Sequence, residues 1–259
     1  MKIIDTHAHI DQIEDLEGAL NRAREADVEA IMAIAMNLES SKNLLKIKED
    51  VTDPCIYIAL GMHPSDVNLG DLDELKSLIY THKDKLNAIG EIGLDYWYKW
   101  VSKDEKKKEE QRTAFRALLE VAKDLDLPAI IHSRGAWQDA FDIAQEVGVT
   151  RAEFHWYDGS LKVLESIMKA GYFVSTTPNL AYNANAQAAI GKVNINQLLI
   201  ETDSPVYFIN RKTDEGFKAE PKDVWRTLKA YAAFKGLEEK EALRIFNANA
   251  KRFFNMDGH

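Results

Sequence analysis

KIIDTHAH, residues Lys2–His9, is an apolar run typical of a β-strand, and it ends in two histidines. Seven more short runs of this character follow, separated by longer segments whose apolar residues recur with helical spacing. The eight predicted strands are Lys2–His9, Ala30–Met36, Cys55–Gly61, Ala88–Leu94, Pro128–His132, Ala152–His155, Tyr172–Thr176 and Gln197–Thr202. Eight strands that alternate with helices are typical of a (β/α)₈ barrel, although the strand count alone also permits a doubly wound open sheet.

The ends of these runs favour the barrel. Most of them end in residues capable of chemistry, namely His7 and His9, His63, Glu91 and Asp95, His132 and Arg134, His155, Thr176 and Thr177, and Asp203. A barrel site is assembled from the carboxyl ends of many strands, whereas an open sheet binds its ligand at one crevice. We therefore predict an α/β fold, a (β/α)₈ TIM barrel.

Helical spacing predicts the elements between and after the strands. The segment after Tyr182 is rich in Asn and Ala and predicts only a short helix, and the chain closes with an extra C-terminal helix. No repeat, linker or change of composition marks a second domain, so we expect residues 1–259 to form a single barrel domain. The clearest predicted helices are Leu72–Lys83, Lys107–Leu125, Lys222–Phe234 and a last one from about Leu237 to Phe254.

Composition limits the class of protein. The only cysteine, Cys55, lies in an apolar run, so no internal disulfide can form and a reducing compartment is favoured. Met1 leads directly into a charged motif, and no apolar stretch reaches the roughly 20 residues that cross a bilayer. We expect a cytoplasmic protein without a membrane partner. A net charge of −9 argues against a protein that coats nucleic acid, but not against an enzyme that acts on phosphates through bound cations.

The histidines and two carboxylates predict a metal site. Side chains in a strand repeat with a period of two, so His7 and His9 project from one face, here the barrel interior. Imidazole is a common ligand of divalent metals, and an unpaired buried carboxylate such as Glu91 or Asp203 is costly unless a cation accompanies it. Two other histidines, His82 and His259, are expected to be solvated. Five of the seven histidines lie in or just after predicted strands: His7, His9, His63, His132 and His155.

Six motifs in order along the chain resemble the TatD family of metal-dependent DNases, a branch of the amidohydrolase superfamily. They are Asp5-Thr6-His7-Ala8-His9, Gly61-Met62-His63-Pro64, Gly90-Glu91-Ile92-Gly93-Leu94-Asp95, His132-Ser133-Arg134, His155 and Glu201-Thr202-Asp203-Ser204-Pro205. The late run Asn247–Phe254 resembles the closing helix of that family. One departure is Trp156-Tyr157-Asp158-Gly159, which stands where the family commonly has a small residue, an aromatic, then Ser-Gly, and it bears on the choice of substrate.

The resemblance implies two divalent ions. His7, His9 and Asp203 would hold one ion, His132 and His155 the other, and Glu91 would bridge both. Mixed nitrogen and oxygen ligands suit Zn²⁺ or Mn²⁺, whereas the resemblance adds Mg²⁺, so all three stay open.

The same residues predict hydrolysis by an activated water. Asp203 is the best candidate for a general base, because it could take the proton from that water. His63 could donate to a phosphate oxygen, although a core hydrogen bond is equally expected, and Arg134 could bind a phosphate with its planar fork. Glu201, on the same face as Asp203, is expected to orient a ligand histidine.

Aromatic residues near the strand ends suggest unpaired bases as the substrate. Stacking on an aromatic ring contributes about 1–3 kcal/mol for each base. The loop after the fourth strand also carries five lysines among acidic neighbours, Lys99, Lys103, Lys106, Lys107 and Lys108, which is only suggestive of phosphate binding. The rim aromatics are Tyr96, Trp97, Tyr98, Trp100, Trp137, Trp156, Tyr157 and Tyr207.

Three functions remain to be compared. The leading hypothesis is a phosphodiesterase that acts on DNA, at single strands or 3′ ends, with a DNA or nucleotide-containing substrate and no obligate protein partner. A second keeps the ions but cleaves an amide or ester, such as the aminoacyl link of charged tRNA, in the manner of a deacylase. The third is a barrel with structural ions that binds a protein, and the presence of a plausible base argues against it.

Overall fold

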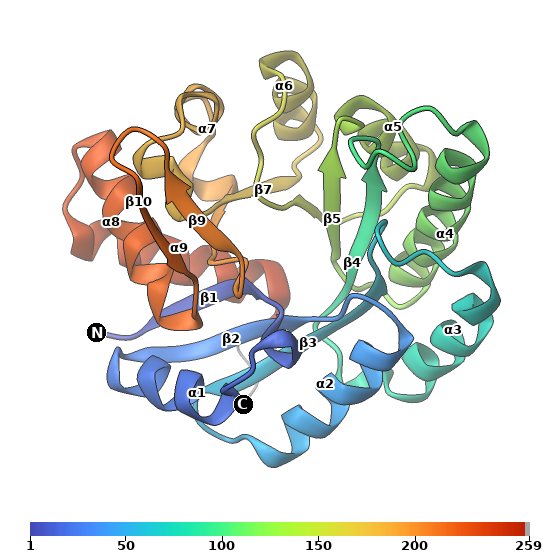
Figure 1. Ribbon diagram of the computed structural model, residues 1–259, viewed down its shortest axis with the longest axis horizontal. Coiled ribbons are helices and arrows are strands. Elements are labelled where there is room, and N and C mark those ends of the chain that lie inside the picture. The colour runs from blue at the N-terminus through green and yellow to red at the C-terminus, as the bar shows by residue number, and fades with distance from the viewer. Residues whose placement is uncertain (257–259) are drawn as a thin grey trace.

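The computed structural model describes residues 1–256 and contains one eight-stranded parallel sheet in the order β1 to β8. Figure 1 shows the strands grouped around a centre, with helices outside them. This arrangement confirms the predicted TIM-type barrel and all eight predicted strands. The strands are β1 (Ile3–Ala8), β2 (Val28–Ile34), β3 (Cys55–Met62), β4 (Ala88–Asp95), β5 (Ala129–Arg134), β6 (Ala152–Phe154), β7 (Phe173–Thr176) and β8 (Leu198–Ile200).

The barrel is nearly closed between β1 and the residues that follow β8. Ala8 forms a parallel bridge with Ser204, and the amide of His9 donates a hydrogen bond of 2.8 Å to the Ser204 carbonyl. The amide of Asp203 donates one of 2.9 Å to the carbonyl of His7. This seam therefore brings Asp203 beside the two histidines at the end of β1.

Helices cover the outside and one end of the barrel. The extra C-terminal helix is α9, and α7 has seven residues, so the short helix expected after Tyr182 is confirmed. Each of the clearest predicted helices is found with bounds shifted by a few residues. The helices are α1 (Leu16–Glu25), α2 (Leu38–Asp50), α3 (Leu72–Thr81), α4 (Glu105–Asp124), α5 (Trp137–Val147), α6 (Leu161–Lys169), α7 (Ala184–Ile190), α8 (Val224–Lys235) and α9 (Glu239–Phe254).

Two hydrophobic clusters stabilise this arrangement. The larger one joins the outward side chains of the strands to the buried faces of the surrounding helices. The smaller one contains Ile4, Met32 and Leu199 from the strands, together with Ala250, Phe253 and Phe254 of α9. The smaller cluster therefore fills the barrel interior below the carboxyl ends of the strands. Helix α9 covers the opposite end of the barrel.

The regular alternation of side chains is interrupted in β1 and β4. Ile4 belongs to the interior cluster, and the pairing of β1 with β2 is irregular between Asp5 and Ala8. In β4, Ala88 is interior, and the pairing with β5 is irregular between Ile89 and Ile92. Such irregularities re-aim side chains next to active sites. In a regular strand, residues three apart point to opposite faces. Here the irregularities let His7 face the interior like Ile4, and Glu91 like Ala88.

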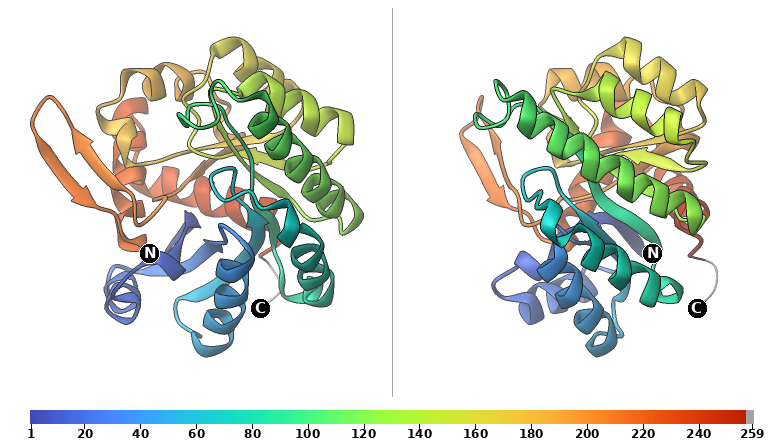
Figure 2. Two further views of the ribbon diagram at one scale, coloured as in Figure 1. Left: turned by 45° about the vertical axis from the view of Figure 1, so that its right-hand side comes forward. Right: turned by 90° about the vertical axis from the view of Figure 1, so that its right-hand side faces the viewer.

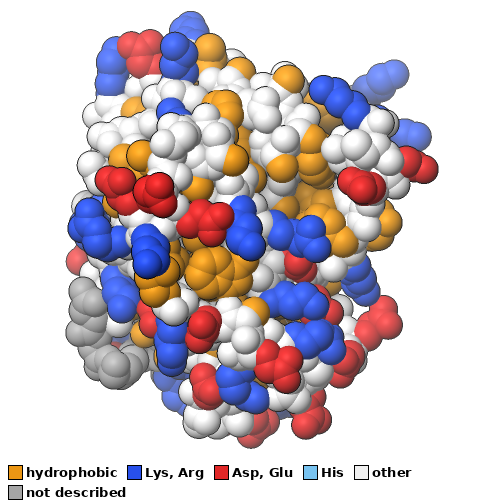
Figure 3. All heavy atoms as spheres, turned by 90° about the vertical axis from the view of Figure 1, so that its left-hand side faces the viewer, with side chains coloured by type: hydrophobic (Ala, Val, Ile, Leu, Met, Phe, Trp, Pro, Cys, Tyr) orange, Lys and Arg blue, Asp and Glu red, His pale blue; other side chains and the backbone are white. Residues whose placement is uncertain are grey.

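A hairpin of two strands, β9 (Tyr207–Asn210) and β10 (Glu215–Lys218), was not predicted. It projects from the barrel in both views of Figure 2. The face that carries it has acidic, basic and hydrophobic side chains intermixed (Figure 3). His82 follows α3 and is half-buried, whereas His259 lies outside the described residues. Among residues 1–256, none of the helices combines the length and apolar character that a membrane span requires.

Candidate metal centre

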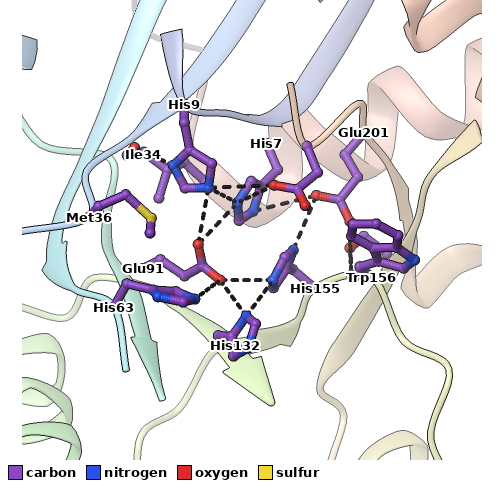
Figure 4. Close-up of polar contacts among 12 residues, drawn as sticks. His7, His9, Ile34, Met36, His63, Glu91, His132, His155, Trp156 and Glu201 are labelled. Carbon is purple, nitrogen blue, oxygen red and sulfur yellow. Dashed lines mark hydrogen bonds and ion pairs between the residues drawn. The ribbon is translucent and has the colours of Figure 1, made fainter. Parts of the chain in front are cut away.

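Six of the predicted site residues converge at the carboxyl ends of the strands. Figure 4 shows His7, His9, Glu91, His132 and His155 around one centre, with Glu91 in the middle. The Glu91 side chain comes from β4, and only 1% of it is exposed to solvent. The centre opens into a cavity of about 600 Å³, so a substrate can reach it.

One oxygen of Glu91 faces the β1 histidines. His9 Nε2 lies 3.2 Å and His7 Nε2 3.4 Å from Glu91 Oε2. Asp203 Oδ1 lies 3.4 Å from His9 Nε2 and 3.6 Å from His7 Nε2. His7, His9 and Asp203 thus offer three ligand atoms close enough to hold one cation.

The other oxygen of Glu91 faces two further histidines, His132 in β5 and His155 directly after β6. His155 Nε2 lies 2.8 Å and His132 Nδ1 2.9 Å from Glu91 Oε1. The two ring nitrogens are 3.2 Å apart. The two oxygens of one carboxylate therefore face two separate pairs of imidazole nitrogens.

Buried acceptors fix which nitrogen of two rings carries a hydrogen. His9 Nδ1 lies 2.8 Å from the carbonyl oxygen of Ile34, which can only accept, so Nδ1 is the donor. His132 Nε2 lies 2.9 Å from Asp95 Oδ2 and is the donor in the same way. In each neutral ring the remaining nitrogen turns a lone pair toward Glu91. Lone pairs that face carboxylate oxygens repel each other unless a proton or a cation lies between them, so this donor set fits divalent metal ions.

His63 has the opposite arrangement. The amide of Ser65 donates a hydrogen bond of 3.0 Å to His63 Nδ1, so the ring proton is on Nε2. Burial lowers the pKa of His63 well below its usual range, which keeps the ring neutral. His63 Nε2 lies 3.7 Å from Glu91 Oε1. Although its position would allow it to join Glu91 and His132 around a cation, this tautomer makes Nε2 a hydrogen-bond donor.

Protons compete with metal ions in this centre. Burial would lower the pKa of His9, but its hydrogen bonds to Asp203 and Glu91 raise the pKa to about 10. Without an ion, His9 is therefore protonated at pH 7, and an entering cation must displace that proton. For each proton released on binding, we expect metal affinity to fall by about tenfold with each unit by which the pH is lowered below the pKa of His9. Calorimetry in two buffers of different ionisation enthalpy counts these protons, and binding without proton release would contradict the expectation.

Glu201 lies beneath the centre and reaches one histidine from each group. Its Oε2 is 3.4 Å from His7 Nδ1 and 3.5 Å from His155 Nδ1. Its Oε1 accepts hydrogen bonds from Ser175 Oγ (2.6 Å) and from the amide of Trp156 (2.8 Å). This placement agrees with the expected orienting role.

We expect Glu201→Gln to weaken metal binding by about 10- to 100-fold. The neutral amide would no longer favour the Nδ1–H form of His7 and His155, which directs Nε2 toward Glu91. Competition with a metal-binding dye measures the affinity. Glu220→Gln, which alters a half-buried carboxylate paired with Arg22, is the matched control. Equal affinities for the two variants would show that Glu201 does not orient these rings.

Asp95 connects the centre to the cavity rim and was not assigned a role from the sequence. Its Oδ2 accepts from His132 Nε2 and from Arg134 Nε, each at 2.9 Å. The Arg134 guanidinium lies over the rings of Tyr98 (4.9 Å) and Trp97 (5.9 Å). Within residues 1–256 its Nη atoms form no hydrogen bond, so they are free to bind an anion.

The rim differs in part from the sequence expectation. Trp97 is 71% exposed, and Trp97, Tyr98, Trp137 and Trp156 line the cavity together with Asp158. Tyr157 is only 1% exposed and belongs to the core, so its expected place on the rim was wrong.

The lysine run after β4 is paired with carboxylates at two of its five positions. Lys107 pairs with Glu110, and Lys108 pairs with Glu105. No lysine of the run lines the cavity in the described part of the chain.

Comparison with known proteins gives consistent matches along the whole chain. The family profile described as TatD-related DNase matches residues 4–255. Human deoxyribonuclease TATDN3 is 30% identical over 97% of this chain and 94% of its own length. YabD of Bacillus subtilis, an uncharacterized metal-dependent hydrolase, is 31% identical over 98% of this chain and 100% of its own. The crystal structure of the TatD homologue YjjV from Escherichia coli superposes with a TM-score of 0.87 at 27% identity, covering 98% of each chain.

Proposed function

Because the chain belongs to the TatD-related DNase family of metal-dependent hydrolases, we propose that it is a deoxyribonuclease that cleaves phosphodiester bonds of DNA with two divalent ions. The substrate would be a single strand or a 3′ end. Residues 1–259 would act as one catalytic domain. The ions would be Zn²⁺, Mn²⁺ or Mg²⁺.

The proposed ligands follow the two sides of Glu91. His7, His9 and Asp203 would hold one ion, and His132 and His155 the other. The observation that carries this assignment is the orientation of two rings, since the hydrogen bonds of His9 Nδ1 and His132 Nε2 direct the other nitrogen of each ring toward Glu91, where a cation would take the place of a proton. When bound, the two ions would supply an activated water and would neutralise charge on the phosphate.

Asp203 is the proposed general base. Burial would raise its pKa, but the hydrogen bond with His9 and the charge of His7 lower it. The carboxylate is therefore ionised at neutral pH and can accept a proton from the attacking water. Asp203 lines the cavity, so a water bound there can reach it.

His63 and Arg134 are the proposed phosphate-binding residues. His63 Nε2 carries a proton and lines the cavity beside Glu91, so it can donate to a phosphate oxygen. Arg134 is held by Asp95 through Nε, which leaves its Nη atoms for a second oxygen. The aromatic rings beside Arg134 could stack with an unpaired base.

A single-stranded oligonucleotide tests the proposed activity. We expect chelated protein to be inactive and to recover DNA cleavage when Zn²⁺, Mn²⁺ or Mg²⁺ is added back. Asp158 is an acidic residue on the rim and could bind the amino group of an aminoacyl ester, so such an ester is the comparison substrate. A higher kcat/KM on the ester than on DNA would contradict the deoxyribonuclease function and favour that of a deacylase.

A further inference from the structure

A second hollow lies beside the catalytic cavity. It has a volume of about 450 Å³ and is formed between the β9–β10 hairpin and residues 179–183. Trp156 lines both this hollow and the catalytic cavity. A polymeric substrate bound at the metal centre can therefore extend past Trp156 into the second hollow.

The hairpin is held in place by aromatic packing. Phe208 is buried and packs against Trp156, with ring centroids 5.3 Å apart. On the neighbouring strand, Phe217 contacts Phe208 and lies under the Arg226 guanidinium at 4.3 Å. The wall of the hollow is thus anchored to the barrel, although the hairpin projects from it (Figure 2).

Tyr207 presents an exposed ring at the edge of this wall. The ring lies across Gly216, where a Cβ atom would come within 2.6 Å of the Tyr207 hydroxyl. Gly216 therefore leaves room for the ring to rest against the hairpin backbone. The Tyr207 residue is nevertheless 62% exposed, which leaves ring surface available for stacking.

Polar and basic groups complete the hollow. Asn179 is only 5% exposed, and its Oδ1 has no hydrogen-bond partner within the described chain. Arg211 and Lys212 lie at the hairpin turn and form no ion pair with any of residues 1–256. The acidic residues that follow, Asp214 in the turn and Glu215 at the start of β10, do not line the hollow.

The charge of this edge contrasts with that of the whole chain. The protein carries a net charge of −9, yet the two charged side chains that line the hollow are both basic. In Figure 3, basic side chains stand out at the top of the projection at the upper right, with acidic and hydrophobic side chains below them. An aromatic surface next to free cations is the combination that binds single-stranded nucleic acid.

We propose that this hollow is a second nucleotide subsite, which holds the DNA strand beyond the scissile phosphate. It rests on the proposed deoxyribonuclease function. A base stacks on Tyr207, and the Arg211–Lys212 turn contacts the following phosphates. A substrate that ends at the catalytic cavity cannot use these contacts, so the enzyme favours longer strands.

Strand length provides the test. Tyr207→Ala and the double variant Arg211→Ala/Lys212→Ala are compared on a dinucleotide and on a single strand of about ten nucleotides. For both variants we expect KM for the longer strand to rise about tenfold, with kcat nearly unchanged. Tyr207→Ala loses one stacked base, and the double variant loses two phosphate contacts. KM for the dinucleotide should change less than KM for the longer strand. The control Lys240→Ala/Arg244→Ala removes the same charge from α9, whose contacts with β1 and β8 lie at the other end of the barrel.

Binding without catalysis separates this proposal from the proposed function. Fluorescence anisotropy of a labelled strand of about ten nucleotides, with chelator present, should show about tenfold weaker binding for both hairpin variants. Equal binding by the variants, the control and the wild type would overturn the subsite, even if the enzyme cleaves DNA. If the wild type cleaves neither substrate, the proposed function fails, and the anisotropy result still decides whether the hollow binds DNA.

Discussion

Replacing Asp203 by Asn should lower kcat for DNA cleavage by about 10³-fold, measured at saturating metal. Asn keeps the size of the side chain and an oxygen that can face His9, but it cannot accept a proton at neutral pH. The backbone contact that closes the barrel, from the Asp203 amide to the His7 carbonyl, is unaffected by the change. The variant should therefore fold, and it should retain at least the ion assigned to His132 and His155.

The control for this variant is Asp223→Asn. Asp223 is also a buried aspartate in the segment after β8, but it pairs with Arg226 and lies outside the cavity. Circular dichroism and thermal unfolding would show that both variants are folded. Undiminished cleavage by metal-loaded Asp203→Asn would remove Asp203 as the base.

Replacing Glu91 by Gln should have an even larger effect, about 10⁴-fold or more on kcat/KM. Each oxygen of Glu91 faces a different pair of histidines, so loss of its charge weakens both proposed ion sites together. Gln offers a single acceptor oxygen, which can serve only one of these pairs, and its NH₂ group would face the other pair and could not bind that ion. Metal content measured by mass spectrometry should fall from two ions per chain to fewer than one.

The outcome for Glu91 separates a bridging ligand from an ordinary one. If Glu91→Gln keeps one tightly bound ion and loses the other, Glu91 belongs to one site only. Glu220→Gln, which neutralises the half-buried carboxylate paired with Arg22, should retain both ions and full activity.

The barrel could be predicted because its strands are buried on both faces. Such strands are near-continuous apolar runs, and this is why Ala88–Leu94 and the other runs are recognisable in the sequence. Histidines at their ends then indicate a common site, since parallel strands bring their carboxyl ends together.

Side-chain direction within the strands could not be predicted in the same way. Simple alternation from the interior residue Ala88 would place Glu91 on the outer face, and only the irregular pairing of β4 with β5 turns it inward. The role of Asp95 depends on the pairing of Asp95 with Arg134 across β4 and β5, which the sequence does not specify. Tyr157 turns into the core after Trp156, a residue with a positive φ of 42°.

The β9–β10 hairpin was missed for a related reason. Its strands have mixed polarity, and the contacts that hold it come from Trp156 and Arg226, which belong to other elements. The position of a short, exposed hairpin is set by such distant contacts rather than by local pattern.

The central claim is that two ions lie on either side of Glu91. Anomalous diffraction from a crystal grown with Zn²⁺ or Mn²⁺ measures this most directly. The predicted result is two peaks, one in contact with His7, His9 and Asp203 and the other with His132 and His155, and both in contact with Glu91. A single peak, or a peak held by His63 in place of His155, would contradict this account.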